Sequence, residues 1–310
     1  MASVGSIVGG AFRLFRERPD AVVVWTAVNL LASLAVGIGL TYWLTGSLEG
    51  PGAAAYLQTD EVPAAGFWLA FAIAYVAMFI LGVVLMNAVF RTVLRPEQRG
   101  FASLRLGTDE LRIAALVMIS AVVAFVGMFL TQLLLMFLGS FLVMVAGDGM
   151  VSGLVMVLLF VAYFCATLWL AVRLSLMFPL TLYRGSFSVD AAWELGRGRF
   201  WKLFTSYLIV MLFLVALGIA ISWVLMGDYW AAMWAARGDP AAMELAALEF
   251  TQRQQEMSIL ERLAQTLIGS LIAAAGLVLG PGVIASATRE LLIDRGEDAD
   301  PAQDWSEAEI

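Results

Sequence analysis

The sequence predicts an all-α, polytopic membrane protein with six transmembrane helices. Of its 310 residues 62% are hydrophobic and 14% are charged, whereas soluble domains have roughly 45–50% apolar and about 25% charged residues. Six stretches, each at least 24 residues long, contain no Asp, Glu, Lys or Arg. The basic residues are concentrated in alternate connections between these stretches. The composition excludes a soluble enzyme, a disordered chain and a secreted disulfide scaffold, because a water-soluble protein of this size could not bury so much apolar surface.

The six uncharged stretches give the predicted spans. A helix needs about 20 apolar residues to cross a bilayer, and lipid offers the backbone no hydrogen-bond partners, so the spans must be helical. A membrane barrel would alternate polar and apolar residues, and runs such as 114–119 do not alternate. We predict spans at about 21–45, 66–90, 113–138, 150–174, 203–226 and 265–289.

The distribution of basic residues predicts the orientation. Fifteen of the 18 Lys and Arg residues precede the first span, follow the last or lie in the second and fourth connections, and only three lie in the loop 228–262. The positive-inside rule then places both termini in the cytoplasm and this loop on the outer side. The predicted organisation is a cytoplasmic amphipathic helix (1–20), a membrane domain (21–290) and an acidic cytoplasmic tail (291–310). A single Lys against 17 Arg, with abundant Ala, is typical of a GC-rich bacterial genome, so the predicted location is the bacterial inner (cytoplasmic) membrane.

Three cytoplasmic segments have the pattern of interfacial amphipathic helices. Apolar residues fall on one helical arc in 7–15, before Pro19, and again in 189–204, while the segment 101–106 is similar but less regular. Such helices lie in the headgroup plane with the apolar side towards the lipid. Their near-constant spacing predicts a threefold internal repeat of interfacial helix, span, span. A duplication would also fit six spans.

The outer loop 228–262 carries two signals. Its aromatic residues 229–234 predict a short amphipathic turn at the membrane interface. Asp239 followed by Pro240 is typical of a helix start, and a Glu249–Arg253 pair at i, i+4 supports the helix that follows. A solvated helix and a partner-binding lid are both compatible with this pattern.

The sequence offers little for catalysis. It has no histidine and one cysteine, Cys165 in an apolar run, so we predict no metal, no cofactor and no catalytic residue. The predicted spans have no ionisable residue near a midplane, which counts against an ion-coupled transporter.

Four polar residues inside spans either join helices by hydrogen bonds or line a substrate cavity: Asn29, Asn87, Gln132 and Gln265. Helix kinks or breaks, which build sites in many transporters, are predicted at Pro179, Gly280, Pro281 and Gly282.

Basic and aromatic residues of the cytoplasmic segments are predicted to contact lipid headgroups. The run 197–202 mixes the two types as nucleic-acid-binding segments do, but it adjoins a span, which favours anionic lipid over nucleic acid. The predicted interface residues are Arg13, Arg16, Arg91, Arg95, Arg173, Trp193, Arg197, Arg199, Trp201 and Lys202.

The stretches 173–179 and 188–204 resemble a bacterial membrane-domain family. The shared pattern is an Arg leaving a span, a Pro, an amphipathic helix with a Trp, and then Gly and an aromatic residue entering the next span: Arg173, Pro179, Trp193, Gly196 and Phe200. The family is the membrane domain of some glycerophosphoryl diester phosphodiesterases, which also occurs as stand-alone proteins. The phosphodiesterases act through histidines and metal-binding carboxylates in a soluble domain. This chain has no histidine and too few residues after 290 for such a domain, so the resemblance implies the fold without the hydrolase activity.

The sequence therefore favours a non-enzymatic membrane component that organises lipids or partner proteins through its basic cytoplasmic face. Its predicted partners are membrane lipids or another membrane protein, with no nucleic acid, and the sequence leaves its oligomeric state open. The alternative is a permease or lipid transporter with a polar cavity. The tail could fold back onto the basic face, recruit a basic partner or remain disordered.

Overall fold

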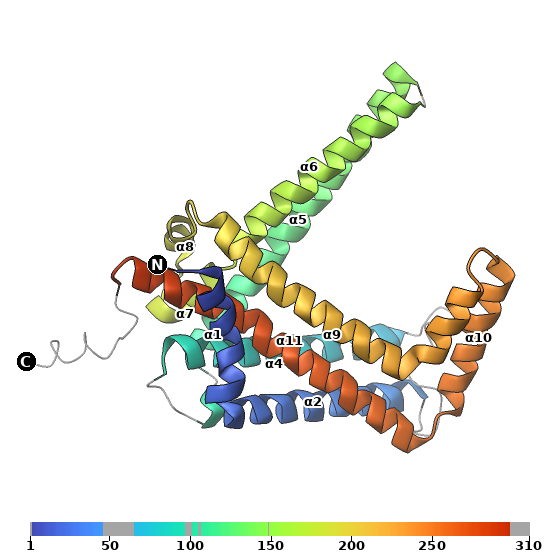
Figure 1. Ribbon diagram of the computed structural model, residues 1–310, viewed down its shortest axis with the longest axis horizontal. Helices are drawn as coiled ribbons and strands as arrows, with labels where there is room; N and C mark the ends of the chain where they lie inside the picture. Colours follow the sequence, from blue (N-terminus) through green and yellow to red (C-terminus); the bar gives the residue numbers. More distant parts are fainter. Residues whose placement is uncertain (1, 46–64, 97–100, 105–106, 148, 298–310) are drawn as a thin grey trace, which may run out of the picture. The chain divides into compact units, whose positions relative to one another are not determined.

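The computed structural model describes residues 2–45, 65–96, 101–104, 107–147 and 149–297, and their regular structure is entirely helical (Figure 1). This confirms the predicted all-α class. The elements are α1 (Val4–Glu17), α2 (Pro19–Thr45), α4 (Ala65–Leu94), the 3-10 turn η1 (Phe101–Ser103), α5 (Thr108–Ala146), α6 (Met150–Leu174), α7 (Met177–Arg184), α8 (Val189–Leu195), α9 (Phe200–Ala235), α10 (Pro240–Glu256) and α11 (Ile259–Asp294).

Six of the described helical segments are long and apolar enough to cross a membrane. Their apolar side chains stay largely exposed: in the most apolar windows of α9 and of the segment Met150–Arg184, only 6% of residues are buried. In water such surfaces would drive aggregation, whereas in a bilayer they face lipid. The chain is therefore a multi-pass integral membrane protein, as the uncharged stretches predict.

The chain forms two compact units, whose boundaries cut through α1, α4, α9 and α11. Unit 1 contains the described parts of Met1–Gly10, Asn87–Tyr207 and Gly282–Ile310, and unit 2 contains those of Ala11–Met86 and Leu208–Pro281. These boundaries do not coincide with the predicted ones at residues 20 and 290. Each unit is described below by itself.

In unit 1, α5 and α6 run side by side as a long hairpin (Figure 1). α7 packs against α5, and α8 packs against α6 and α7. The buried residues of α5 all lie in its first three turns: Glu110, Ile113 and Leu116. The predicted span 113–138 is therefore too short at its far end, because α5 continues to Ala146. Its first turns pack against α7, and the later turns form the hairpin with α6.

The predicted interfacial segments differ in structure from one another. α1 is the expected helix before Pro19, with Ile7 and Ala11 fully buried. The predicted helix over 189–204 is wrong, because the chain leaves the helix after α8 and Gly198 takes a left-handed φ of 73° before α9 begins. In 101–106 the described part contains only the three-residue η1, and residues 105–106 lie outside the described ranges. These segments do not share one structure, so they give the threefold repeat no support.

The helix break predicted as one alternative at residues 280–282 is not formed, because α11 continues through Gly280, Pro281 and Gly282, with Pro281 inside the helix. A kink at this position, the other alternative, stays a prediction. The break predicted at Pro179 is seen one turn earlier, where Ser175 and Leu176 separate α6 from α7. This is the expected place, because a proline cannot donate to the carbonyl four residues before it and its ring crowds that carbonyl. Within α9, Met226 is non-helical (φ −130°, ψ 24°), although no proline marks the site.

Candidate functional site

Most of the interactions between distant polar side chains lie where the helix ends of unit 1 meet. We call this set of segments (residues 2–6, 91–112, 173–202 and 289–297, as far as described) the arginine-rich region. The described parts of unit 1 contain ten basic and seven acidic residues. The acids and backbone carbonyls nearby decide which of these cations remain free to meet an external ligand.

The innermost element is an ion pair between Arg91 at the end of α4 and Glu110 at the start of α5. Arg91 is 2% exposed and Glu110 is 6% exposed, and the guanidinium contacts the carboxylate directly. Arg91 also donates a hydrogen bond to the carbonyl of Ser103, at 2.8 Å. A buried charge needs such compensation, because desolvation costs several kcal/mol. Arg91 is thus an internal residue, and the prediction that it contacts lipid headgroups is wrong.

The chain segment that caps Arg91 is held in an unusual backbone conformation. Ala102 and Ser103 have φ of 49° and 55°, a left-handed region that costs residues with a Cβ about 1–3 kcal/mol. The Thr92 hydroxyl lies 3.2 Å from the Ser103 hydroxyl, and together with Arg91 it fixes this turn. Packing around the Arg91–Glu110 pair therefore offsets local strain.

Asn87 lies one turn before Arg91 on the same face of α4 and is fully buried. Among the described residues, neither atom of its amide has a hydrogen-bond partner, and the Nε of Arg91 has none either. These buried polar atoms of α4 thus lack the hydrogen bonds that buried polar groups normally make. Of the predicted cavity residues, Asn87 and Asn29 are both buried, and the amide atoms of Asn87 are left without a partner among the described residues.

Arg173, near the end of α6, is held between two tryptophans. Its guanidinium lies 3.7 Å from the ring centre of Trp193 on α8 and 5.2 Å from that of Trp169 on α6. It also donates to the Trp193 carbonyl, at 3.3 Å. A Cβ on Gly196 would approach the Arg173 side chain to 3.4 Å. Arg173, Trp193 and Gly196, three of the residues on which the family resemblance rests, therefore lie close together. Trp169 was not predicted, because only the fold brings α6 against α8.

Residues near the two ends of the described chain meet in the arginine-rich region. The Ala2 amide donates to the Asp294 carboxylate, at 2.9 Å, and Arg199 lies 3.6 Å from the same carboxylate. Lys202 donates to the Ala2 carbonyl, at 3.2 Å. Both ends of the described chain therefore lie at the same end of unit 1.

Residues preceding the predicted tail and within it join the same region. Glu290 accepts from the Ser6 hydroxyl, at 2.9 Å. Glu297 pairs with Arg184 at 3.0 Å, and Arg295 donates to the Glu194 carbonyl. The first residues of the tail, which continue α11 to Asp294, thus contact other segments of unit 1, and the three interpretations of the acidic end of the tail stay predictions. Residues 298–310 lie outside the described ranges.

The predicted interface residues fall into two classes. Arg91 is buried, and Arg95, Arg173 and Arg199 are half-buried. Arg95 donates to the Tyr183 carbonyl, at 3.0 Å, and lies 3.6 Å from Asp109. The exposed residues in unit 1 are Trp193, Arg197, Trp201 and Lys202, and Trp201 is 73% exposed. Arg13 and Arg16 are also exposed, but they belong to unit 2.

The four predicted cavity residues do not gather within either unit. In unit 1, Asn87 is buried near the end of α4, and Gln132 is exposed on α5. In unit 2, Asn29 is 4% exposed and Gln265 is half-buried. The three cavities described in unit 2 are lined by other residues.

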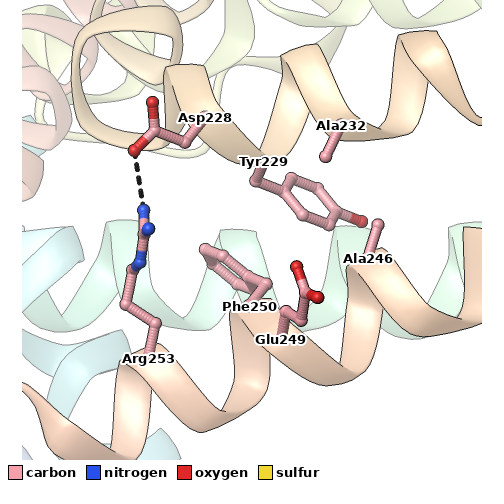
Figure 2. Close-up of a pocket in the computed structure, with 7 residues that line it drawn as sticks. All are labelled: Asp228, Tyr229, Ala232, Ala246, Glu249, Phe250 and Arg253. Carbon is pink, nitrogen blue, oxygen red and sulfur yellow. Dashed lines mark hydrogen bonds and ion pairs between the residues drawn. The ribbon is translucent and has the colours of Figure 1, made fainter.

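The α9–α10 hairpin of unit 2 holds a small polar cavity of about 70 Å³ (Figure 2). Asp239 caps α10 by accepting from the Ala241 and Ala242 amides, at 3.0 and 3.3 Å, which confirms the predicted helix start. The predicted aromatic turn is instead the continuation of α9, and the Tyr229 ring lies 4.6 Å from that of Phe250. Arg253 pairs with Asp228 across the hairpin, at 2.7 Å, rather than with Glu249.

A metal site is not formed in the described part of the chain: it contains no group of three or more Cys, Asp or Glu residues placed to hold an ion. Comparison of the chain with protein-family models, with curated proteins and with solved structures gave no match. The resemblance to the membrane domain of glycerophosphoryl diester phosphodiesterases therefore stays a prediction.

Proposed function

We propose that this chain is a non-enzymatic component of a bacterial inner membrane that binds anionic lipid headgroups through its arginine-rich region, with that region facing the cytoplasm. The observation that carries the proposal is the start of α9. There Trp201 is 73% exposed beside the exposed Arg197. Tryptophan at the end of a span prefers the interface, and a basic residue there attracts anionic headgroups by about 1 kcal/mol.

The internal ion pairs support the choice of these residues. Five of the seven described acids of unit 1 contact a partner through their carboxylates, namely Asp109, Glu110, Glu290, Asp294 and Glu297. Four of these acids hold an arginine within the protein, whereas Glu290 accepts from the neutral Ser6 hydroxyl. Arg197 and Arg289 are exposed and have no such acidic partner among the described residues. The exposed Lys202 and Arg295 also lack an acidic partner there, but each donates to a backbone carbonyl, so Arg197 and Arg289 are the exposed cations of unit 1 that are least held by the protein.

Lipid retention tests the proposal directly. The protein in mild detergent would be incubated with phosphatidylglycerol or phosphatidylcholine, and bound lipids counted by native mass spectrometry. We expect phosphatidylglycerol to be preferred, and Arg197→Gln with Trp201→Leu to reduce its retention about fivefold or more, since one surface charge contributes about 1 kcal/mol.

The matched control is Arg253→Gln with Trp234→Leu. It removes an exposed arginine and a tryptophan that is 68% exposed from the α9–α10 hairpin. Retention should stay within twofold of the unmodified protein. Equal losses in the two double variants, or no preference for phosphatidylglycerol, would contradict the proposal. Solute flux through reconstituted liposomes would favour the permease instead.

A further inference from the structure

Gln132 lies near the middle of the α5–α6 hairpin. Gly139 of α5 faces Met156 of α6, because a Cβ at Gly139 would lie 3.1 Å from the Met156 methyl carbon. In an antiparallel pair, residue 132 then lies opposite residue 163, near the centre of Met150–Leu174. At 1.5 Å per residue, α6 is about 37 Å long, slightly more than the roughly 30 Å hydrocarbon core. Gln132 is therefore placed close to the bilayer centre.

The side chain of Gln132 does not point into the hairpin. The residues of α5 that are partly covered in this stretch are Thr131, Leu135 and Gly139, whereas Gln132 is exposed. Met128 and Met136, one turn before and one turn after it, are 57% and 68% exposed. No hydrogen bond of the Gln132 amide is formed within the described residues. Its face of α5 is thus an apolar surface with one polar group near its centre.

This arrangement is unfavourable for a chain surrounded only by lipid. A primary amide carries two donors and an acceptor, and hydrocarbon offers no partner to any of them, which costs several kcal/mol. Amide side chains in spans therefore hydrogen-bond to another helix. The partner must have both a donor and an acceptor at the same depth.

We propose that two copies of this chain associate through the Gln132 face of α5, with the two Gln132 amides paired across a two-fold axis. A two-fold axis along the membrane normal places each residue opposite its own copy at the same depth. An amide is complementary to itself, because each copy can donate an N–H to the carbonyl of the other. The face presents no charge that would select a different partner. Its flanking methionines are flexible enough to pack against identical neighbours.

The first test is the mass of the protein in detergent or nanodiscs. The unmodified chain is expected to be a dimer. Gln132→Leu, which keeps the span apolar, should raise the dimer dissociation constant about 3- to 30-fold, the range typical of one hydrogen-bonded pair between spans. Gln132→Asn retains an amide and should weaken the dimer less. A monomeric unmodified protein, or a Gln132→Leu dimer of unchanged affinity, would overturn the proposal.

Cysteine cross-linking maps the contact independently. In a Cys165→Ala background that keeps Gln132, Met136→Cys, one turn along the same face, should form an intermolecular disulfide under mild oxidation in membranes. Leu134→Cys is the matched control, because Leu134 is 63% exposed but lies about 200° around the helix from residue 136. Equal cross-linking at both positions, or none at residue 136, would mean that Gln132 is satisfied otherwise, for example within its own chain. These outcomes leave the lipid-retention experiment unaffected.

Discussion

The arginine-rich region of unit 1 and the α9–α10 hairpin of unit 2 use the same chemistry in opposite surroundings. Each contains an arginine–carboxylate pair and an arginine over a tryptophan ring. In the arginine-rich region the pair of Arg91 and Glu110 has side chains that are 3% and 8% exposed. In the hairpin, Arg253 and Asp228 are 66% and 84% exposed.

This difference determines what each pair contributes. An exposed pair is screened by water and salt, so it contributes about 0–1 kcal/mol to stability. A buried pair gains little net energy over an apolar pair of the same size, but removing one partner leaves an uncompensated charge. The arginine-rich region also joins residues nearly 300 positions apart, whereas the hairpin pair joins residues 25 positions apart. Unit 1 should therefore be sensitive to single charge removals that unit 2 tolerates.

The largest expected effect is that of Glu110→Gln. It leaves Arg91 charged, buried and without its carboxylate, and we expect the free energy of unfolding to fall by about 3–5 kcal/mol. The measurement is a denaturant titration of the protein in micelles, followed by tryptophan fluorescence. The double variant Arg91→Met with Glu110→Leu should recover most of this loss, because no buried charge remains.

The neighbouring Asp109→Asn serves as the control. Asp109 is 26% exposed at its side chain and contacts Arg95 at 3.6 Å and Arg112 at 3.3 Å. Its loss should cost clearly less than that of Glu110. If the two variants are equally destabilised, burial is not what distinguishes the pairs.

A smaller effect is expected at Gly10, where α1 approaches α11 closely within unit 1. A Cβ there would lie 2.7 Å from the hydroxyl and 2.9 Å from the Cβ of Ser286, which is 4% exposed. Gly10→Ala adds overpacking of about 1–3 kcal/mol and gains about 1 kcal/mol of helix propensity. We expect a net loss of up to about 2 kcal/mol in the same titration.

Gly9 offers a matched comparison, since a Cβ there meets nothing within 4 Å. Gly9→Ala should be neutral or stabilising by up to about 1 kcal/mol. Combining Gly10→Ala with Ser286→Gly should remove the clash and restore stability. A double variant no more stable than Gly10→Ala would show that the close approach is not the cause.

The sequence predicted those features that depend on composition and on near neighbours in the chain. The six spans follow from uncharged stretches, α1 follows from its apolar arc, and the start of α10 follows from Asp239 and Pro240. Each of these signals is contained within a few turns of helix. The exposed tryptophan and arginine at the start of α9 were found for the same reason.

The errors concern contacts between distant segments. Nothing in the sequence near Arg91 indicates that Glu110 will cover it, so a buried arginine was predicted to meet lipid. The predicted span 113–138 ended before α5 does. The length of an apolar stretch does not tell how many of its turns pack against another helix, here α7, before the span begins. A break of α11 at Pro281, one alternative to a kink, was wrong, because neighbouring groups can re-satisfy a proline-containing helix in a membrane. The four polar span residues were grouped by type, and the fold separates Gln132 from Asn87.

The smallest expected effect is that of Arg253→Gln in the α9–α10 hairpin. The pair it removes is short, at 2.7 Å, but highly exposed, so the loss should stay below about 1 kcal/mol and decrease further with added salt. The ring contact of Tyr229 with Phe250, at 4.6 Å, and the Asp239 cap remain to hold the hairpin. Hydrogen exchange of residues 240–256 measures this local stability, with Asp228→Asn as the reciprocal variant. A loss comparable to that of Glu110→Gln would mean that the hairpin pair is shielded from water in the membrane-bound protein, and the contrast between the two regions would fail.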